Sequence, residues 1–81
     1  MLTYLSKVIV TDEKMVYKYG LTKDKLDGLI EVDRLDFNKA ANVTLASEDG
    51  SRGQHAVRAI ANMIRYHRNN EFPDKDMRAS G

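Results

Sequence analysis

The sequence has 81 residues and a formal net charge of +1, with 42% hydrophobic residues, 31% charged residues and no cysteine. A chain of this length builds one domain and has too little material for a second core, and its composition excludes a disordered or fibrous protein. The lack of cysteine excludes disulfides and thiolate metal sites, and it fits the cytoplasmic location that we expect. No apolar run approaches the ~20 residues that span a bilayer, so we expect no contact with membranes.

The first 19 residues predict a β-hairpin. Apolar and polar residues alternate from Leu2 to Val10, and the alternation resumes in the segment MVYKY. A two-residue turn between the two segments would place Val10 opposite Met15 and Val8 opposite Tyr17. Both apolar sets then lie on one side of the sheet, as a single buried face requires.

A second hairpin is predicted from two further alternating segments, LIEVD and NVTLA. A turn at residues 37–38 would pair Val32 with Val43 and Ile30 with Leu45. The apolar residues of this hairpin then share one face as well.

Helical periodicity dominates residues 51–70, which contain four arginines and no acidic residue. Ser51 followed by Gln54 matches a capping box at the start of this helix. The apolar residues recur at helical spacing and should seal the core; they are Val57, Ile60, Ala61 and Ile64. A basic stripe with two amides is expected on the opposite side; it consists of His55, Arg58, Asn62, Arg65 and Asn69.

Together these elements predict an α+β fold of the order ββββα, in which a four-stranded antiparallel sheet carries the C-terminal amphipathic helix on one face. We expect residues 1–73 to form the single domain and residues 74–81 to form a flexible tail. The predicted core consists of Val8, Val10, Tyr17, Ile30, Val32, Val43, Leu45, Ile60 and Ile64.

The basic stripe is the main functional candidate in the sequence. Arginine can bind phosphates or carboxylates, and Arg and Asn can read base edges when their helix lies in a major groove. A solvated helix face would have the same composition, and no DNA- or RNA-binding motif accompanies the stripe. The sequence therefore favours a small non-catalytic interaction module, without cofactor or metal, whose partner is a protein or a nucleic acid.

The alternative is a small enzyme that uses metal-dependent or acid/base chemistry. Glu31 and Asp33 share a strand face, where two carboxylates could hold a divalent cation or work with a histidine. The solvated side of the sheet would look the same. His55 and His67 lie on different sides of the helix, so they cannot bind one metal together, and we predict no enzyme.

Self-association is suggested by apolar residues on the sheet face opposite the predicted core. Ile9, Val16 and Leu29 fall on that face. A cluster of exposed apolar residues is typical of a contact surface, so we expect a homodimer that uses this patch.

Overall fold

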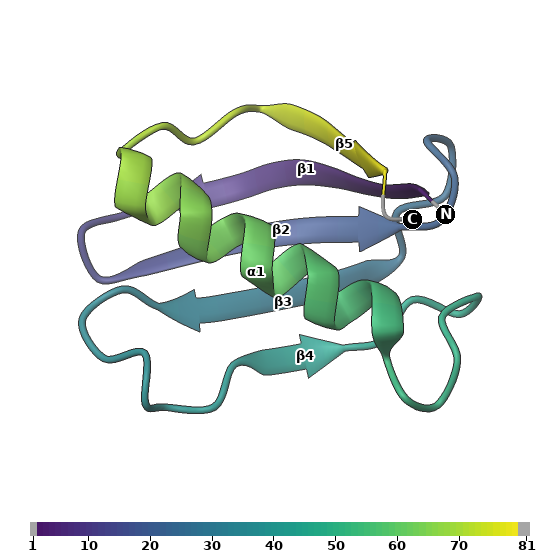
Figure 1. Ribbon diagram of the computed structural model, residues 1–81, viewed down its shortest axis with the longest axis horizontal. Helices are drawn as coiled ribbons and strands as arrows, with labels where there is room; N and C mark the ends of the chain where they lie inside the picture. The colour runs from purple at the N-terminus through teal and green to yellow at the C-terminus, as the bar shows by residue number, and fades with distance from the viewer. Residues whose placement is uncertain (1, 80–81) are drawn as a thin grey trace.

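The computed structural model describes residues 2–79, which form an antiparallel sheet with one helix packed on one face (Figure 1). The strands of the described chain are β1 (Leu2–Val10), β2 (Lys14–Gly20), β3 (Gly28–Asp33), β4 (Asn42–Thr44) and β5 (Lys75–Ala79), and the helix is α1 (Gln54–Asn69). The sheet order is β4-β3-β2-β1-β5. The predicted α+β class with an antiparallel sheet is confirmed.

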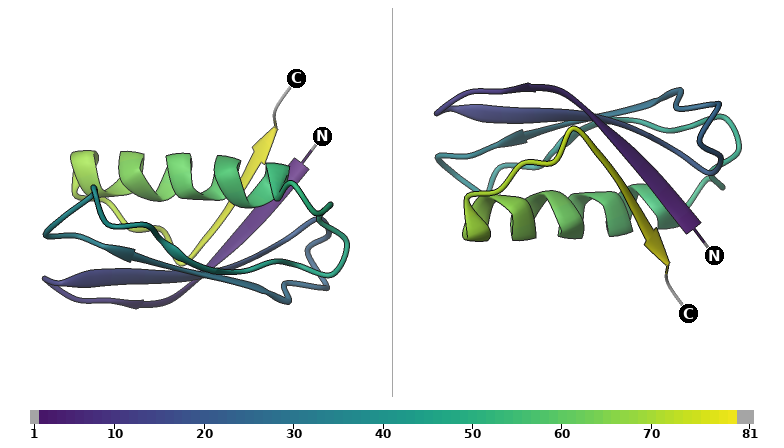
Figure 2. Two further views of the ribbon diagram at one scale, coloured as in Figure 1. Left: turned by 90° about the horizontal axis from the view of Figure 1, so that it is seen from below. Right: turned by 90° about the horizontal axis from the view of Figure 1, so that it is seen from above.

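In the two edge-on views of Figure 2, α1 lies on one side of the sheet and the opposite face is open. No helix in the described chain is long and apolar enough to cross a membrane.

The sheet has five strands where four were predicted, because the expected flexible tail contains β5. This strand pairs antiparallel with β1, from Leu2 opposite Ala79 to Ser6 opposite Lys75. Two tyrosines hold the segment in place: Tyr17 donates a hydrogen bond to the Pro73 carbonyl at 2.8 Å, and Tyr66 donates one to the Asp76 carboxylate at 2.5 Å. The polar composition of this segment hid a strand that needs few apolar residues at the edge of a sheet.

A β-bulge in β1 changes which of its residues face the helix. Val10 lies opposite Met15 as predicted, but Lys7, and not Val8, lies opposite Tyr17. The extra residue in the strand reverses the alternation on its N-terminal side. Thr3 and Leu5 are therefore buried on the helix side, while the Val8 side chain is 49% exposed.

The helix is rotated relative to the prediction. Its buried side consists of small and long side chains, Ala56, Ala59, Met63 and Tyr66, together with His55. Alanines let the helix approach the sheet closely, and the Tyr66 ring packs on the Tyr17 ring with their centroids 5.3 Å apart. Val57, which was predicted to seal the core, is 63% exposed.

The pairing of β3 with β4 is shifted by two residues from the predicted register, with Ile30 opposite Val43. The connection between the strands, residues 34–41, is longer than a tight turn. It starts at the Asp33 carboxylate, which accepts hydrogen bonds from the backbone amides of Leu35 at 2.8 Å and Asp36 at 3.2 Å.

The core lies between the helix and the three central strands. Of the predicted core, Tyr17, Ile30 and Val32 are buried, and Val10 and Ile60 pack at its edge. Val8, Val43 and Leu45 are exposed instead, and Ile64 is only half-buried. The buried apolar residues among those described also include Leu5, Met15, Tyr19, Ala46, Ala56, Ala59, Met63 and Tyr66.

Candidate functional site

A buried carboxylate fixes where the helix begins. Asp49 accepts hydrogen bonds from the Tyr19 hydroxyl at 2.8 Å and from the backbone amides of His55 at 3.2 Å and Ala56 at 3.0 Å. The N-cap residue itself is Gly53, with φ of 59° and no side-chain cap, so the predicted capping box at Ser51 is absent. Asp49 therefore replaces that box and anchors the first turn of α1 to β2.

Gly53 brings the start of the helix very close to the end of β4. A Cβ atom at Gly53 would lie 2.9 Å from Cδ2 of Leu45, which is closer than packed carbon atoms allow. The backbone also has a positive φ at this position, a conformation that strains residues with side chains. Glycine thus lets the Leu45 side chain lie directly against the first turn of α1.

Beside this contact, α1 and β4 leave a shallow groove of about 220 Å³ between them. We call it the α1–β4 groove. Its lining is mainly apolar and contains no acidic residue; it consists of Val43, Leu45, Ser51, Arg52, Gly53, Ala56, Val57 and Ile60.

The groove exists because the helix packs mainly over β1, β2 and β3 and covers β4 less closely. Val43 pairs with the buried Ile30, so its side chain points to the helix side of the sheet, yet it is 39% exposed. Leu45, which lines the same groove, is 41% exposed. On this side of the core, apolar side chains that face the helix remain exposed to solvent.

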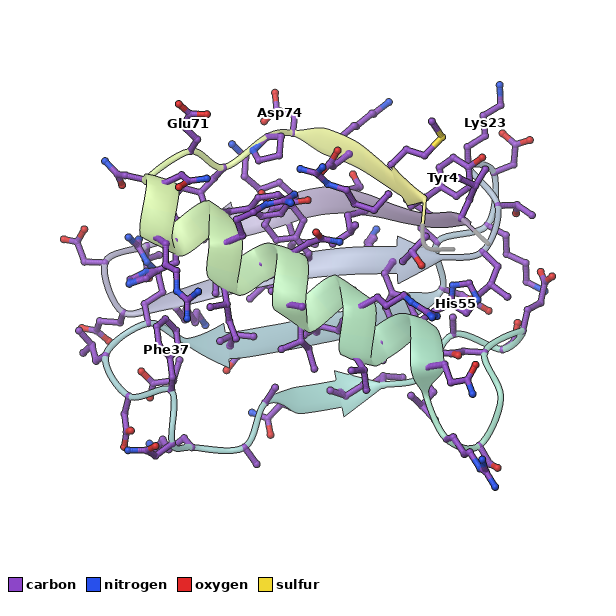
Figure 3. All side chains as sticks on the ribbon, in the orientation of Figure 1. Tyr4, Lys23, Phe37, His55, Glu71 and Asp74 are labelled. Atoms are coloured by element: carbon purple, nitrogen blue, oxygen red, sulfur yellow. The ribbon has the colours of Figure 1, made fainter. Side chains whose placement is uncertain are left out.

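The same side of the molecule also carries an open edge of the sheet. Within residues 2–79, β4 pairs only with β3, so its outer backbone groups have no neighbouring strand. The loop that precedes β4 adds Leu35 and Phe37, which are 74% and 44% exposed. The Phe37 ring packs edge-on against His67 with centroids 4.9 Å apart, which holds the loop near the C-terminal half of α1, at the opposite end of the helix from His55 (Figure 3).

The predicted basic stripe does not face solvent as one unit. His55 is only 8% exposed, and its Nδ1 lies 2.7 Å from the Thr3 hydroxyl. Arg58, Asn62 and Arg65 are half-buried along one flank of the helix, and Asn69 is exposed.

This flank is also less basic than the sequence suggested. Arg65 and Asn69 line a cavity of about 530 Å³ together with Glu71, Asp76 and other residues near β5. One guanidinium nitrogen of Arg65, Nη2, is buried and makes no hydrogen bond with any described residue. Arg78 lines the same cavity and pairs with Asp76, so two arginines and two carboxylates balance there and leave no excess of positive charge for a phosphate.

The carboxylates of the enzyme hypothesis are not assembled with a histidine. Glu31 lies on the open face of the sheet, 3.9 Å from the Lys14 ammonium. Asp33 lies at the start of the loop after β3. The hydrogen bond from the Leu35 amide, and then the one from the Asp36 amide, hold the pKa of its carboxyl below the ordinary value. His67 instead accepts a hydrogen bond from Arg34 at 3.1 Å. In residues 2–79, no group of three or more His, Asp and Glu side chains could hold a metal ion.

The residues of the predicted dimer patch do share the open face of the sheet. Ile9 and Val16 are paired across β1 and β2, and Leu29 lies in the next strand. Ile9 is 47% exposed and Leu29 41%, whereas Val16 is only 7% exposed because its neighbours cover it.

No family model, curated protein or solved structure matches the chain in comparisons with known proteins. The geometry of the described residues is therefore the basis on which its function is inferred.

The sequence pattern assigned four apolar residues of the groove to the core, Val43, Leu45, Val57 and Ile60, but one signal pointed to their exposure. The helix has two apolar sides, one with Ala56, Ala59 and Met63 and one with Val57, Ile60 and Ala61. A helix on a single sheet can bury only one such side completely. The second apolar side, which the sheet cannot cover, therefore indicated a further contact surface.

Proposed function

We propose that the protein is a non-catalytic interaction module that binds an extended segment of a partner protein along β4. Side chains of that segment occupy the α1–β4 groove. The observation that carries this proposal is the exposure of apolar side chains at the edge of the core, where Val43, Leu45 and Val57 line one groove. Exposed apolar residues gathered at one place are typical of contact surfaces.

Strand addition explains how the partner's backbone would be held. A strand at the edge of a sheet offers unpaired N–H and C=O groups, and an extended peptide can bind them as a further strand. Alternate side chains of such a peptide point to the same face of the sheet. Those on the helix side would complete the core beside Val43 and Val57.

Charge defines the chemistry of the partner more closely. Arg52 lines the groove, and an adjacent hollow is lined by Arg52, Gln54, Val57 and Arg58, without an acidic residue in either place. Arg52 makes no hydrogen bond or ion pair with another described residue. The favoured segment is therefore apolar at alternate positions and carries a carboxylate near Arg52.

A protein partner is favoured over a nucleic acid by the same distribution of charge. Arg65 of the predicted stripe shares its cavity with Arg78 and with Glu71 and Asp76, whose two carboxylates balance the two guanidinium groups. A surface for duplex DNA or RNA needs several cationic side chains free to approach the phosphates.

The experiment is an NMR titration of the ¹⁵N-labelled full chain with a synthetic peptide of alternating valine and glutamate. We expect the amide signals of residues 42–45 and 52–60 to shift. Val57→Glu should weaken binding roughly tenfold or more, because a charge in an apolar contact is costly. Val8→Glu is the matched control, since Val8 is also an exposed valine, at 49%, but lies far from the groove in β1.

Three results would overturn the proposal. The first is equal weakening by Val57→Glu and Val8→Glu. The second is a β4-mediated dimer of the free protein in light scattering, since a second copy would then occupy the edge. The third is salt-sensitive binding to duplex DNA or RNA that Arg58→Ala with Arg65→Ala reduces, which would support the nucleic-acid hypothesis instead.

A further inference from the structure

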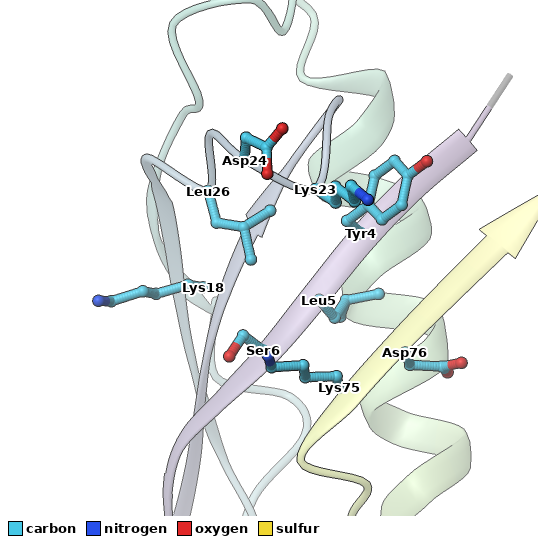
Figure 4. Close-up of a pocket in the computed structure, with 9 residues that line it drawn as sticks. All are labelled: Tyr4, Leu5, Ser6, Lys18, Lys23, Asp24, Leu26, Lys75 and Asp76. Atoms are coloured by element: carbon cyan, nitrogen blue, oxygen red, sulfur yellow. The ribbon is translucent and has the colours of Figure 1, made fainter.

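The open face of the sheet carries a second cavity, of about 650 Å³, on the side away from α1. Figure 4 shows that its lining side chains come from β1, β2, β5 and the loop between β2 and β3. Those that bear on its chemistry are Tyr4, Ser6, Lys18, Lys23, Leu26 and Lys75.

Two of the lysines flank one serine across the sheet. Ser6 in β1 pairs with Lys18 in β2 on one side and with Lys75 in β5 on the other, so the three side chains point to the same face. In Figure 4, Lys75 reaches back across β1 toward Ser6, and Lys18 extends away from the helix. The two ammonium groups repel each other across β1, and an anion bound between them would relieve that repulsion.

Neither lysine has a carboxylate partner within residues 2–79, and neither does Lys23. All four of the other lysines in the described chain form ion pairs with Asp or Glu, at distances of 2.9 to 3.9 Å; these are Lys7, Lys14, Lys25 and Lys39. The three unpaired ammonium groups therefore gather at one cavity.

The carboxylates near the cavity do not neutralise it. Asp76 points toward α1 in Figure 4, where it accepts hydrogen bonds from Tyr66 at 2.5 Å and Arg78 at 3.0 Å. Asp24, in the loop with Lys23, is the other acidic residue of the lining. Three cationic groups thus face one carboxylate that is not engaged elsewhere.

We propose that this cavity binds a small organic phosphate. The ammonium groups of Lys18, Lys23 and Lys75 and the Ser6 hydroxyl would hold its phosphate groups, since lysine binds phosphate as a point charge. The Tyr4 ring and the Leu26 side chain offer a surface for a planar or apolar part of the ligand. The volume falls within the range of about 300–1,000 Å³ that small-molecule sites show. This site lies on the opposite face from the α1–β4 groove and does not depend on it.

The test is an NMR and calorimetric titration of the full chain with ATP, inorganic pyrophosphate and adenosine at about 0.05 M salt, where charge interactions are weakly screened. We expect ATP and pyrophosphate to shift the amides of residues 4–6, 18, 23–26 and 75, with ATP binding more tightly and adenosine not binding.

Lys18→Gln with Lys75→Gln should weaken ATP binding roughly tenfold, because each lost ammonium removes a charge-assisted contact. Lys14→Gln with Lys39→Gln is the matched control, since it removes the same charge from exposed lysines outside the cavity and should leave the affinity within about twofold. If both double variants weakened ATP binding equally, the affinity would depend only on the net charge of the protein, and the proposal would be overturned. Failure of both phosphates to bind, or equal binding of adenosine, would also overturn it.

Discussion

The hydroxyl of Tyr19 lies 2.8 Å from the carboxylate of Asp49 and donates a hydrogen bond to it. The same hydroxyl accepts a hydrogen bond from the Ala46 backbone amide at 3.0 Å. Tyr19 thus ties the segment that leaves β4 to the residue that caps α1. The position of the helix over the sheet, and with it the shape of the α1–β4 groove, depends on this pair.

Replacement of Asp49 by alanine should lower the free energy of unfolding by about 2–4 kcal/mol, because it removes a helix cap and leaves the buried Tyr19 hydroxyl without its acceptor. Urea denaturation followed by circular dichroism measures this. Ser51→Ala, at the cap position that the sequence suggested, should change the free energy by less than about 0.5 kcal/mol. A larger effect at Ser51 than at Asp49 would contradict the capping role described here.

Stability should also fall in acid because of Asp49. Burial alone would raise the pKa of this carboxyl, but hydrogen bonds from Tyr19 and from the His55 and Ala56 amides outweigh burial and hold the pKa below its ordinary value. A carboxyl with a lowered pKa in the folded state stabilises the protein above its unfolded pKa of about 4, and this contribution is lost as the pH falls through the folded pKa.

The measurement is urea denaturation between about pH 6 and pH 2, a range that brackets the titration of aspartate. The wild type should lose stability more steeply than Asp49→Asn, in which this group no longer titrates. Asp27, Asp33 and Asp74 also have lowered pKa values, but they remain in both proteins and cancel in the comparison. Parallel curves would show that Asp49 does not contribute.

The rotation of the helix predicts which truncations matter. Met63 is fully buried, so Met63→Ala should cost about 2–4 kcal/mol. Val57 is 63% exposed, so Val57→Ala should cost less than about 0.5 kcal/mol. Thermal or urea denaturation of the two variants compares them directly. The opposite order of effects would restore the orientation that the sequence pattern suggested.

The class of fold could be predicted from the sequence because alternation and helical spacing are local properties. The segments around Tyr17, Ile30 and Val57 show their strand or helix periods without knowledge of their neighbours. The rotation of α1 could not be predicted in this way. Val57 and Ile60 are more hydrophobic than Ala56 and Ala59, but the close approach of the helix to the sheet favours the smaller side chains.

Two further features depend on contacts between distant residues. The segment of β5 is mostly polar, and it becomes a strand because the edge of β1 and the hydroxyls of Tyr17 and Tyr66 are there to bind it. The cavity on the open face of the sheet is likewise lined by Lys18 and Lys75, which are far apart in sequence. Neither pairing leaves a periodic signal that could be detected before the sheet order is known.

Attachment of β5 should depend on the Tyr66 hydroxyl. Burial and the neighbouring Asp76 carboxylate raise the pKa of Tyr66, so the hydroxyl remains a donor to Asp76. Tyr66→Phe should speed hydrogen exchange in residues 75–79 roughly fivefold, the effect of about 1 kcal/mol, and leave β2 and β3 unchanged. Tyr4→Phe is the control, because its hydroxyl has no partner among the described residues. Equal exchange in both variants would exclude this role.

The homodimer predicted from Ile9, Val16 and Leu29 remains testable on the open face. Ile9→Lys with Leu29→Lys replaces the two exposed members and should give a folded monomer, because charges are excluded from an apolar interface. Val16 is too buried for a lysine to test association separately from folding. Light scattering at tens of micromolar measures the mass. A wild type that already has the monomer mass of 9.2 kDa refutes the dimer.

The bulge at Val8 makes one position of β1 dispensable in a way that no other is. Lys7 and Ile9 already pair with Tyr17 and Val16, which are adjacent residues in β2. Removal of Val8 from the chain would therefore join two residues whose pairing is consecutive, and every other side chain of β1 would keep its present face. Removal of Ser6 would instead either turn the residues before it to the opposite side of the sheet or, if the bulge closed, place Lys7 opposite Lys18 and Val8 opposite Tyr17 and so change their faces. A one-residue deletion, which usually disrupts the pairing of a strand, is thus accommodated most simply at the bulge itself.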